Sequence, residues 1–526
     1  MNSHVGLVPF FKRGDIGGLT YLVTNNIVNY LIVIATLSGV LKWPDKVVFG
    51  YVIPGMSIGL FLGCCYYAWM GYRISKRDQR PDVTALPSGV STTAMFVMLY
   101  GVIMPLSYAV EDPMVAWSAA MAACFLGGVI EFVGGIVGPW MKKRIPRAAL
   151  LGTVAGIGFI WMATEGVFDI FQDPILGLPV MIIAMLGVFG VYAFPKKIPP
   201  LVVAIVGGIV YAFCLGRTQV DFSDIGFYIP NPVNSIQYMI DGFAVIAPYL
   251  AVIIPVEIYN FIETMDNVEG ANAAGDEYSV RQAQFADGVF TMISACFGGV
   301  VPNTVWLGHV SLKRTVGYSV IAGVILLLAG VLGLFTVLSD IIPKAVVAIT
   351  FLWCAVDMLS QAFRVVDKKY YAAIGVAMVP SVADFLYTQV TGAAGLADLW
   401  TEKVASGIND FAPEVCQALT DAGCMWNGVA AVKAGAIVIG ILLGTMVAFI
   451  IDRRLDKVAI VAFVGAVLSF IGIIHSAAIT INFTNQWGIG YLITGVVCLI
   501  LHFGRNSWCK PDEDMLEYVD DQSEKE

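Results

Sequence analysis

The chain has 526 residues, of which 58% are hydrophobic and only 13% are charged, and its mean hydropathy is +0.79. Soluble globular proteins carry about 25% charged residues, so this composition excludes a soluble enzyme, a coiled coil and a disordered scaffold. The net charge of −9 argues against nucleic acid as a partner, because neutralising phosphates requires basic patches. The composition predicts an all-α polytopic membrane protein that lies in a lipid bilayer.

Apolar runs between charged or Pro/Gly-rich breaks predict the membrane-spanning segments. In chain order we expect sixteen spans, at 18–41, 47–72, 89–108, 114–140, 148–166, 177–194, 200–216, 243–267, 285–299, 303–313, 317–338, 345–362, 370–390, 430–451, 458–478 and 487–504.

The basic residues give the orientation of these spans, because cytoplasmic loops collect Lys and Arg. With the N-terminus inside, all but six of the 30 basic residues fall in cytoplasmic stretches. We therefore expect a multi-pass protein of the plasma (inner) membrane with both termini in the cytoplasm. The six that fall outside are Lys42, Lys46, Arg217, Lys344, Lys403 and Lys433.

The segment 391–428 is the one long loop between predicted spans, and it lies on the outer side. It is acidic and contains Cys416 and Cys424, which on an oxidising face either form a disulfide or remain two free thiols. The remaining cysteines lie mostly in apolar runs, and the four histidines are dispersed. We therefore expect no metal centre and no cofactor.

The third and the tenth predicted spans are interrupted by Pro, Gly and small polar residues. The break in the third reads TALPSGVSTT at 84–93, and the break in the tenth reads GGVVPNTVWLGH at 298–309. Irregular backbone at membrane depth is tolerated only inside protein or around a polar cavity. Such breaks in corresponding halves indicate a transporter's binding site, and third and tenth are the positions that an inverted repeat of seven plus seven spans requires. The alternative is two ordinary proline-kinked helices.

The eighth span carries carboxylates, which within a membrane usually face the bundle interior and mark a substrate or proton path. Helical spacing places Asn260, Glu263 and Asn267 on one face. Glu257 lies nearer the centre of the span and points elsewhere, so position alone leaves open which of the two glutamates is functional. Glu131, among glycines in the fourth span, is interpreted as a residue of helix packing.

Three motifs identify a family. One is FADG at 285–288, followed by FGG at 297–299 and PNT at 302–304; the others are IETMDN at 262–267 and DVTALP at 82–87. Together they resemble the nucleobase–cation symporters of the xanthine/uracil permease type, nearest to their adenine/guanine/hypoxanthine permease branch. The similarity runs over about residues 13–390.

The resemblance implies fourteen segments in two inverted repeats, in which segments three and ten begin as short strands and a core domain moves against a gate domain. Two C-terminal spans exceed this plan. The expected organisation is a cytoplasmic N-terminus at 1–17, a first repeat at 18–216, an extracytoplasmic connection at 217–242, a second repeat at 243–451 that includes the outer loop, two additional spans at 452–504 and an acidic cytoplasmic tail at 505–526.

The resemblance also implies a substrate site between segments three, eight and ten. Glu263 matches the family's substrate-binding carboxylate, which selects it over Glu257. Relatives often carry Glu or Gln where this chain has Gly308, and Asn where it has His309, so the second polar anchor is altered. Either His309 replaces it and couples protons together with Glu263, or it is a structural histidine. The expected substrate-binding residues are Ser91, Thr92, Asn260, Glu263, Asn267, Thr304, Val305, Trp306, Gly308 and His309.

The leading hypothesis is a secondary active transporter that imports a purine-like nucleobase or a related small heterocycle. It would use proton (or sodium) symport with elevator-like alternating access, and the resemblance implies a homodimer. The alternative is an anion transporter of the sulfate, bicarbonate or carboxylate type on the same fold. A membrane-embedded enzyme is a remote alternative, because the sequence offers no nucleophile with a nearby base. A nonselective channel would be excluded by saturable, slow uptake.

Overall fold

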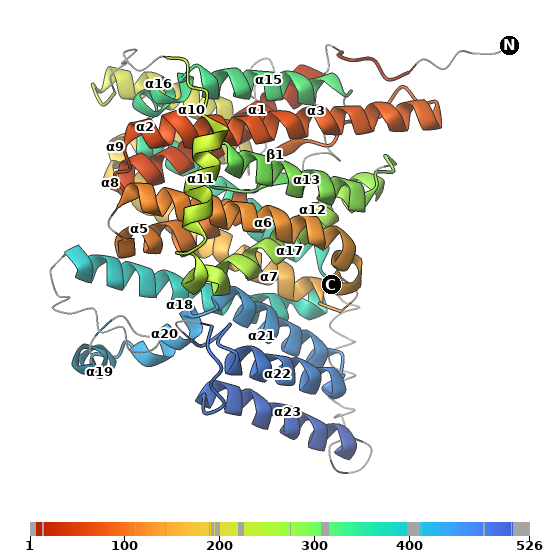
Figure 1. Ribbon diagram of the computed structural model, residues 1–526, viewed down its shortest axis with the longest axis vertical. Coiled ribbons are helices and arrows are strands. Elements are labelled where there is room, and N and C mark those ends of the chain that lie inside the picture. The colour runs from red at the N-terminus through yellow and green to blue at the C-terminus, as the bar shows by residue number, and fades with distance from the viewer. Residues whose placement is uncertain are drawn as a thin grey trace. The chain divides into compact units, whose positions relative to one another are not determined.

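A computed structural model describes the greater part of the chain. The described residues are 7–12, 15–110, 112–142, 144–188, 190, 194, 200–218, 226–273, 275–306, 315–396, 411, 413–476, 479–505 and 508. Their regular structure is almost entirely helical (Figure 1), as the apolar runs predict. Packing divides the chain into two units, unit 1 with Met1–Arg144 and Ile157–Leu359, and unit 2 with Ile145–Gly156 and Ser360–Glu526. Each unit therefore takes segments from both halves of the sequence.

Unit 1 contains the two broken segments and the helices around them. Its elements are α1 (Asp15–Ile34), η1 (Ala35–Val40), α2 (Asp45–Val47), η2 (Val48–Val52), α3 (Ile53–Asp78), β1 (Ser88–Val90), α4 (Thr92–Val97), η3 (Met98–Ile103), α5 (Met104–Val110), α6 (Pro113–Lys142), η4 (Gly158–Ala163), α8 (Thr164–Gln172), α9 (Pro174–Val188), α10 (Pro200–Cys214), α11 (Pro232–Gly242), η6 (Ala247–Tyr249), α12 (Leu250–Ala273), α13 (Val280–Cys296), β2 (Asn303–Val305), α15 (Gly317–Val331), α16 (Leu334–Ile341) and most of α17 (Lys344–Val365).

Unit 2 is built from the helices of the last third of the chain together with most of α7. Its elements are α7 (Arg147–Ile157), η7 (Lys368–Tyr370), α18 (Tyr371–Leu396), α19 (Pro413–Asp421), α20 (Trp426–Lys433), α21 (Ala436–Ile451), α22 (Leu455–Phe470) and α23 (Gln486–Gly504). The two additional C-terminal spans correspond to α22 and α23, which pack against each other.

The helices have the length and composition of membrane spans. Among the described residues six are long and apolar enough to cross a bilayer, or up to eight when each of two bent pairs is taken as one span. The bends are sharp, 85° between α15 and α16 and 90° between α20 and α21. Gly333 and Gly435 lie at these bends with φ of +68° and +94°, a conformation that glycine adopts without steric cost. The protein is a multi-pass helical membrane protein.

Two segments differ from the prediction. The expected span at 303–313 opens as the strand β2, and 307–314 lie outside the described residues. The expected outer loop at 391–428 is partly helical: α18 continues to Leu396 despite the two glycines of the run TGAAGL, and the loop also contains α19 and the start of α20. Cys416 and Cys424 are free thiols in the structure.

The two broken segments meet as an antiparallel pair of short strands. Ser88 pairs with Val305, Gly89 with Thr304, and Val90 with Asn303. The pairing continues beyond both ends, since Ser91 N donates to the Pro302 carbonyl (3.0 Å) and Trp306 N donates to the Pro87 carbonyl (2.9 Å). The predicted strands of segments three and ten are thus present, and the alternative of two merely kinked helices is wrong.

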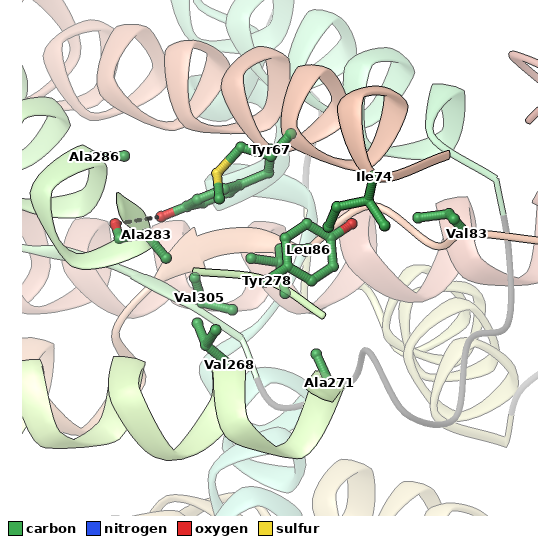
Figure 2. Packing of buried hydrophobic residues seen from close by; sticks show 11 residues of the cluster. Tyr67, Ile74, Val83, Leu86, Val268, Ala271, Tyr278, Ala283, Ala286 and Val305 are labelled. Carbon is green, nitrogen blue, oxygen red and sulfur yellow. Dashed lines mark hydrogen bonds between the residues drawn. The ribbon is translucent and has the colours of Figure 1, made fainter. Parts of the chain in front are cut away.

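A tightly packed core holds this strand pair in unit 1. Figure 2 shows Tyr67 and Ile74 of α3, Val305 of β2, and Val268 and Ala271 of α12 within one buried cluster. In the same unit α6 packs along α13, and α3 packs along both α13 and α15. Buried side chains from four elements therefore fix where β2 lies relative to α12.

Candidate substrate site

The carboxylate of Glu263 lies at the point where β1 passes into the following helix. Ser91 donates its hydroxyl hydrogen to Glu263 Oε2 (3.0 Å), and it is also the N-cap residue of α4. From Thr92 the chain runs helically through α4, η3 and α5 to Val110, so the positive end of this helical run faces the carboxylate. Glu263 is half-buried, whereas Ser91 is fully buried.

Glu257, the other candidate on α12, has no exposed surface. Neither of its carboxyl oxygens has a hydrogen-bond partner among the described residues. A Cβ added at Gly127 would lie 2.5 Å from Glu257 Cδ, so the carboxyl group packs directly on the backbone of α6. Position along the span left open which of the two glutamates is functional. Glu263 is the one whose side chain is partly accessible to solvent.

The two asparagines on the Glu263 face contact the backbone of β2. Asn260 Nδ2 donates to the carbonyl of Asn303 (3.4 Å), and Asn267 Nδ2 donates to the carbonyl of Val305 (2.7 Å). Both amides are buried. In this conformation their side chains hold the strand against α12, a role that helical periodicity alone does not reveal.

Thr304 and Val305 belong to β2 and bond the strand to α12 and α13. Thr304 Oγ1 and Thr264 Oγ1 are hydrogen-bonded at 2.8 Å, and Val305 N donates to Asp287 Oδ2 at 2.9 Å. Both β2 residues are buried, at 1% and 0% exposure. Of the remaining predicted residues, Trp306 is half-buried.

Thr92 is also half-buried and donates to Asn29 Oδ1 (3.2 Å). Gly308 and His309 lie outside the described residues. The structure thus brings Ser91 and Glu263 together directly, and it connects Asn260, Asn267, Thr304 and Val305 through the backbone and side chains of β2.

Sequence reasoning missed two asparagines on α1 that bracket β1. Asn26 Oδ1 accepts a hydrogen bond from Val90 N (3.1 Å), and Asn29 Nδ2 donates to the Val90 carbonyl (3.3 Å). The available signal was their spacing of three residues within a predicted membrane span, which places both amides on one helical face. Buried amides in such a position need partners, and the irregular backbone of β1 supplies them.

A second missed feature is a network of buried hydroxyl and carboxyl groups behind β2. Thr264 Oγ1 lies 3.0 Å from Glu131 Oε1 and 3.2 Å from Asp287 Oδ2. Tyr67 donates its hydroxyl hydrogen to Asp287 Oδ1. Among the described residues no three His, Cys, Asp or Glu side chains gather in the manner of metal ligands.

The segments that form this site lie within the range that is matched by a known protein family. The sequence model of the permease family of the xanthine/uracil type matches residues 83–383, a range that includes β1, α12, α13 and β2. The chain belongs to this permease family. It is therefore a membrane transporter that takes a small-molecule substrate across a lipid bilayer.

Two solved structures are similar to this permease at low sequence identity. No curated protein matches its sequence. Its fold is similar to the transmembrane domain of a cyanobacterium bicarbonate transporter, BicA, with 18% identity, a TM-score of 0.48, and coverage of 73% of this chain and 99% of that one. It is also similar to SLC26A9, with 13% identity, a TM-score of 0.41, and coverage of 70% and 68%.

Proposed function

We propose that this permease imports a purine-like nucleobase or a related small heterocycle by proton symport. The observation that carries the proposal is the position of Glu263, a half-buried carboxylate held by Ser91 at the strand pair of the two broken segments. A carboxylate accepts hydrogen bonds from ring N–H groups, which nucleobases and related heterocycles present along one edge.

The neighbouring residues suit a flat, uncharged ligand. Trp306 follows β2 directly and is half-buried, and an indole ring stacks on a planar heterocycle. Thr92, also half-buried, adds a hydroxyl group at the start of the helix after β1. A site built to hydrogen-bond its substrate discriminates strongly against analogues that lack those groups.

The alternative substrate class, an inorganic or carboxylate anion, fits these residues less well. Neither broken segment contains Lys or Arg between 84 and 93 or between 298 and 309. The ionisable side chain beside the strand pair is instead Glu263, which is negative when ionised. A small anion would be repelled by that carboxylate unless the carboxylate were neutralised.

The transport cycle that we propose follows from the same carboxylate. A glutamate inside a membrane protein that binds substrate and exchanges a proton can couple the two events, because each changes the free energy of the other. We propose a homodimer in the plasma membrane with both termini cytoplasmic, in which the strand-bearing segments move in an elevator-like manner. Sodium in place of the proton is the alternative coupling ion.

The test is ligand-induced thermal stabilisation of the purified protein with nucleobases, ureides and inorganic anions. A ligand that binds only the folded state raises the apparent stability. We expect a purine to raise the melting temperature of the wild type and of Glu277→Gln, whose exposed carboxylate pairs with Arg77 (3.6 Å). We expect Glu263→Gln to lose this effect. Stabilisation by anions alone would refute the nucleobase assignment and favour the anion transporter.

A further inference from the structure

Four helices and one strand contribute to a buried polar cluster behind β2, whose carboxyl groups are not among the predicted substrate-binding residues. We call Glu131 of α6, Thr264 of α12 and Asp287 of α13 the carboxyl cluster; each is 0% exposed. Tyr67 of α3 and the backbone of Val305 in β2 complete it. Two buried carboxyl groups that contact the same hydroxyl group need hydrogen-bond partners, so the position of each proton in the cluster matters.

The hydroxyl of Thr264 makes more contacts than its single hydrogen can serve. Its Oγ1 lies within hydrogen-bond distance of Glu131 Oε1 (3.0 Å), Asp287 Oδ2 (3.2 Å) and Thr304 Oγ1 (2.8 Å). A threonine hydroxyl donates once and accepts up to twice. Thr304 can supply the hydrogen of its own contact. If both carboxyl groups were ionised, one of the remaining two contacts would join two oxygens without a hydrogen between them.

The partners of each carboxyl group decide which one carries the additional proton. The Tyr67 hydroxyl has two acceptors within reach, the Ala283 carbonyl (3.3 Å) and Asp287 Oδ1, and it lies much closer to Asp287 (Figure 2 shows Tyr67 beside Ala283). With this hydrogen at Oδ1 and that of the Val305 amide at Oδ2 (2.9 Å), Asp287 has an environment that satisfies an anion. Glu131 contacts only the Thr264 hydroxyl through Oε1, and its Oε2 has no partner among the described residues. A protonated Glu131 donates to Thr264, and Thr264 then donates to Asp287, so that every close contact contains a hydrogen.

We propose that Glu131 and Asp287 together form a proton-binding site, separate from Glu263, in which Glu131 holds the proton and Thr264 connects it to the Asp287 carboxylate. As a link in the transport cycle, this site rests on the proposed function. The proton site itself does not, since it follows from the hydrogen bonds alone. Glu131, interpreted from sequence as a packing residue, is thereby assigned a chemical role.

The site is mechanically connected to the strand that the substrate site uses. Asp287 holds the Val305 amide, and Thr264 holds the Thr304 hydroxyl, so two successive residues of β2 bond to the carboxyl cluster. Thr264 also follows Glu263 directly on α12. Loss of the proton from Glu131 would leave two negative carboxylates beside one hydroxyl group. Their repulsion would weaken the hydrogen bonds that join the cluster to β2. Protonation and strand position are therefore coupled.

Other ionisable groups face this site from the surrounding helices. From α12, Glu263 precedes Thr264, and Glu257 packs on Gly127, one helical turn before Glu131 on α6. From α3, the Tyr67 hydroxyl contacts Asp287, and from α13 Asp287 itself belongs to the cluster. Glu257 has no hydrogen-bond partner among the described residues, so burial disfavours its charged form as well. It must be distinguished from Glu131 in any measurement.

The experiment is infrared spectroscopy of the purified protein in detergent at neutral pH, in which a protonated carboxyl group gives a C=O stretching band separate from that of carboxylates. We expect Glu131→Gln to remove one such band and Glu257→Gln to remove a different one. We expect the exposed control, Glu277→Gln, to remove none. A spectrum of Glu131→Gln that keeps every protonated-carboxyl band would overturn the proposal.

A second variant keeps the test decisive should Glu131→Gln fail to fold. Thr264→Val preserves the shape of the side chain and removes the hydroxyl that accepts from Glu131. We expect one protonated-carboxyl band of the wild type to shift to higher frequency, because its hydrogen bond is lost, while the band removed by Glu257→Gln stays in place. An unchanged band position in this variant would show that Glu131 does not donate to Thr264, and would likewise overturn the proposal.

Uptake into proteoliposomes then tests the link to transport. We expect Glu131→Gln to shift or flatten the pH dependence of purine uptake, while purine-induced stabilisation is retained. If the band is lost and no heterocycle binds to the wild type, the proton site stands and the proposed substrate fails. If purines bind and accumulate with an unchanged pH profile in Glu131→Gln, the link of this site to transport is refuted.

Discussion

The contact between α6 and α13 allows a quantitative test of how this fold positions its site. Gly288 of α13 and Gly128 of α6 face each other, and a Cβ added at Gly288 would lie 2.6 Å from the Gly128 carbonyl oxygen and 2.7 Å from the Phe132 amide nitrogen. Both neighbours are backbone atoms. Ordinary contact begins at 3.4 Å, so Gly288→Ala would force the two helices apart by about 0.8 Å.

The cost of this substitution can be separated from the helix propensity of alanine. Overpacking a well-packed contact costs about 1–3 kcal/mol, whereas alanine stabilises a helix by up to about 1 kcal/mol relative to glycine. Gly207 of α10 is the matched control, because a Cβ there would meet nothing within 4 Å. The difference in stability between Gly288→Ala and Gly207→Ala therefore isolates the clash. We expect Gly288→Ala to be the less stable of the two by about 1–3 kcal/mol.

Thermal unfolding in detergent, followed by circular dichroism, measures this difference. We expect a melting temperature clearly below that of the wild type for Gly288→Ala, and one equal to or slightly above it for Gly207→Ala. Because Asp287 precedes Gly288 and holds β2, purine-induced stabilisation should also decrease in Gly288→Ala. Equal melting temperatures for the two variants would refute the claim that α6 and α13 meet through their backbones.

Two further substitutions test how the strands are held. Asp276, whose side chain is 7% exposed, accepts a hydrogen bond from the Thr84 amide (3.0 Å), four residues before β1. Arg80→Met removes the guanidinium that pairs with Asp276 at 3.0 Å, and we expect a loss of about 1.5–3 kcal/mol in stability, as for hydrogen bonds to charged groups, seen as a lower melting temperature. Recovery of that temperature in Arg80→Lys would agree with this reasoning, whereas an unchanged temperature in Arg80→Met would contradict it. Asn267→Ala removes the amide that donates to the Val305 carbonyl, and we expect a higher half-saturation concentration for uptake with the protein still folded. Unaltered uptake kinetics would show that this bond does not position β2 for the substrate.

Much of this fold could be predicted from the sequence because the bilayer imposes a strong constraint on composition. Apolar length and the breaks at Pro87 and Pro302 were enough to predict both broken segments, since free backbone groups at membrane depth must find partners. Their pairing through Gly89 and Thr304 agrees with that expectation. The bends at Gly333 and Gly435 were not predicted, because a glycine in an apolar run is equally compatible with a straight helix.

The site was harder to predict, because hydrogen bonds between distant segments decide what each polar residue does. Helical periodicity placed Asn260 and Asn267 beside Glu263, but it could not indicate that their amides bond to β2. The role of Glu131 depends on Thr264 and Asp287, which lie 133 and 156 positions further along the chain. Neither partner stands out without knowledge of which helices pack together.

Proton-coupled import through Glu263 can be measured as uptake of a labelled purine into proteoliposomes with an imposed inward proton gradient. We expect the wild type and Glu277→Gln to accumulate the purine above its external concentration, and a protonophore to abolish the accumulation. We expect Glu263→Gln to be folded but to accumulate none. Accumulation by Glu263→Gln at the wild-type level, or wild-type accumulation that is indifferent to the proton gradient, would contradict the assignment of Glu263 as the coupling residue.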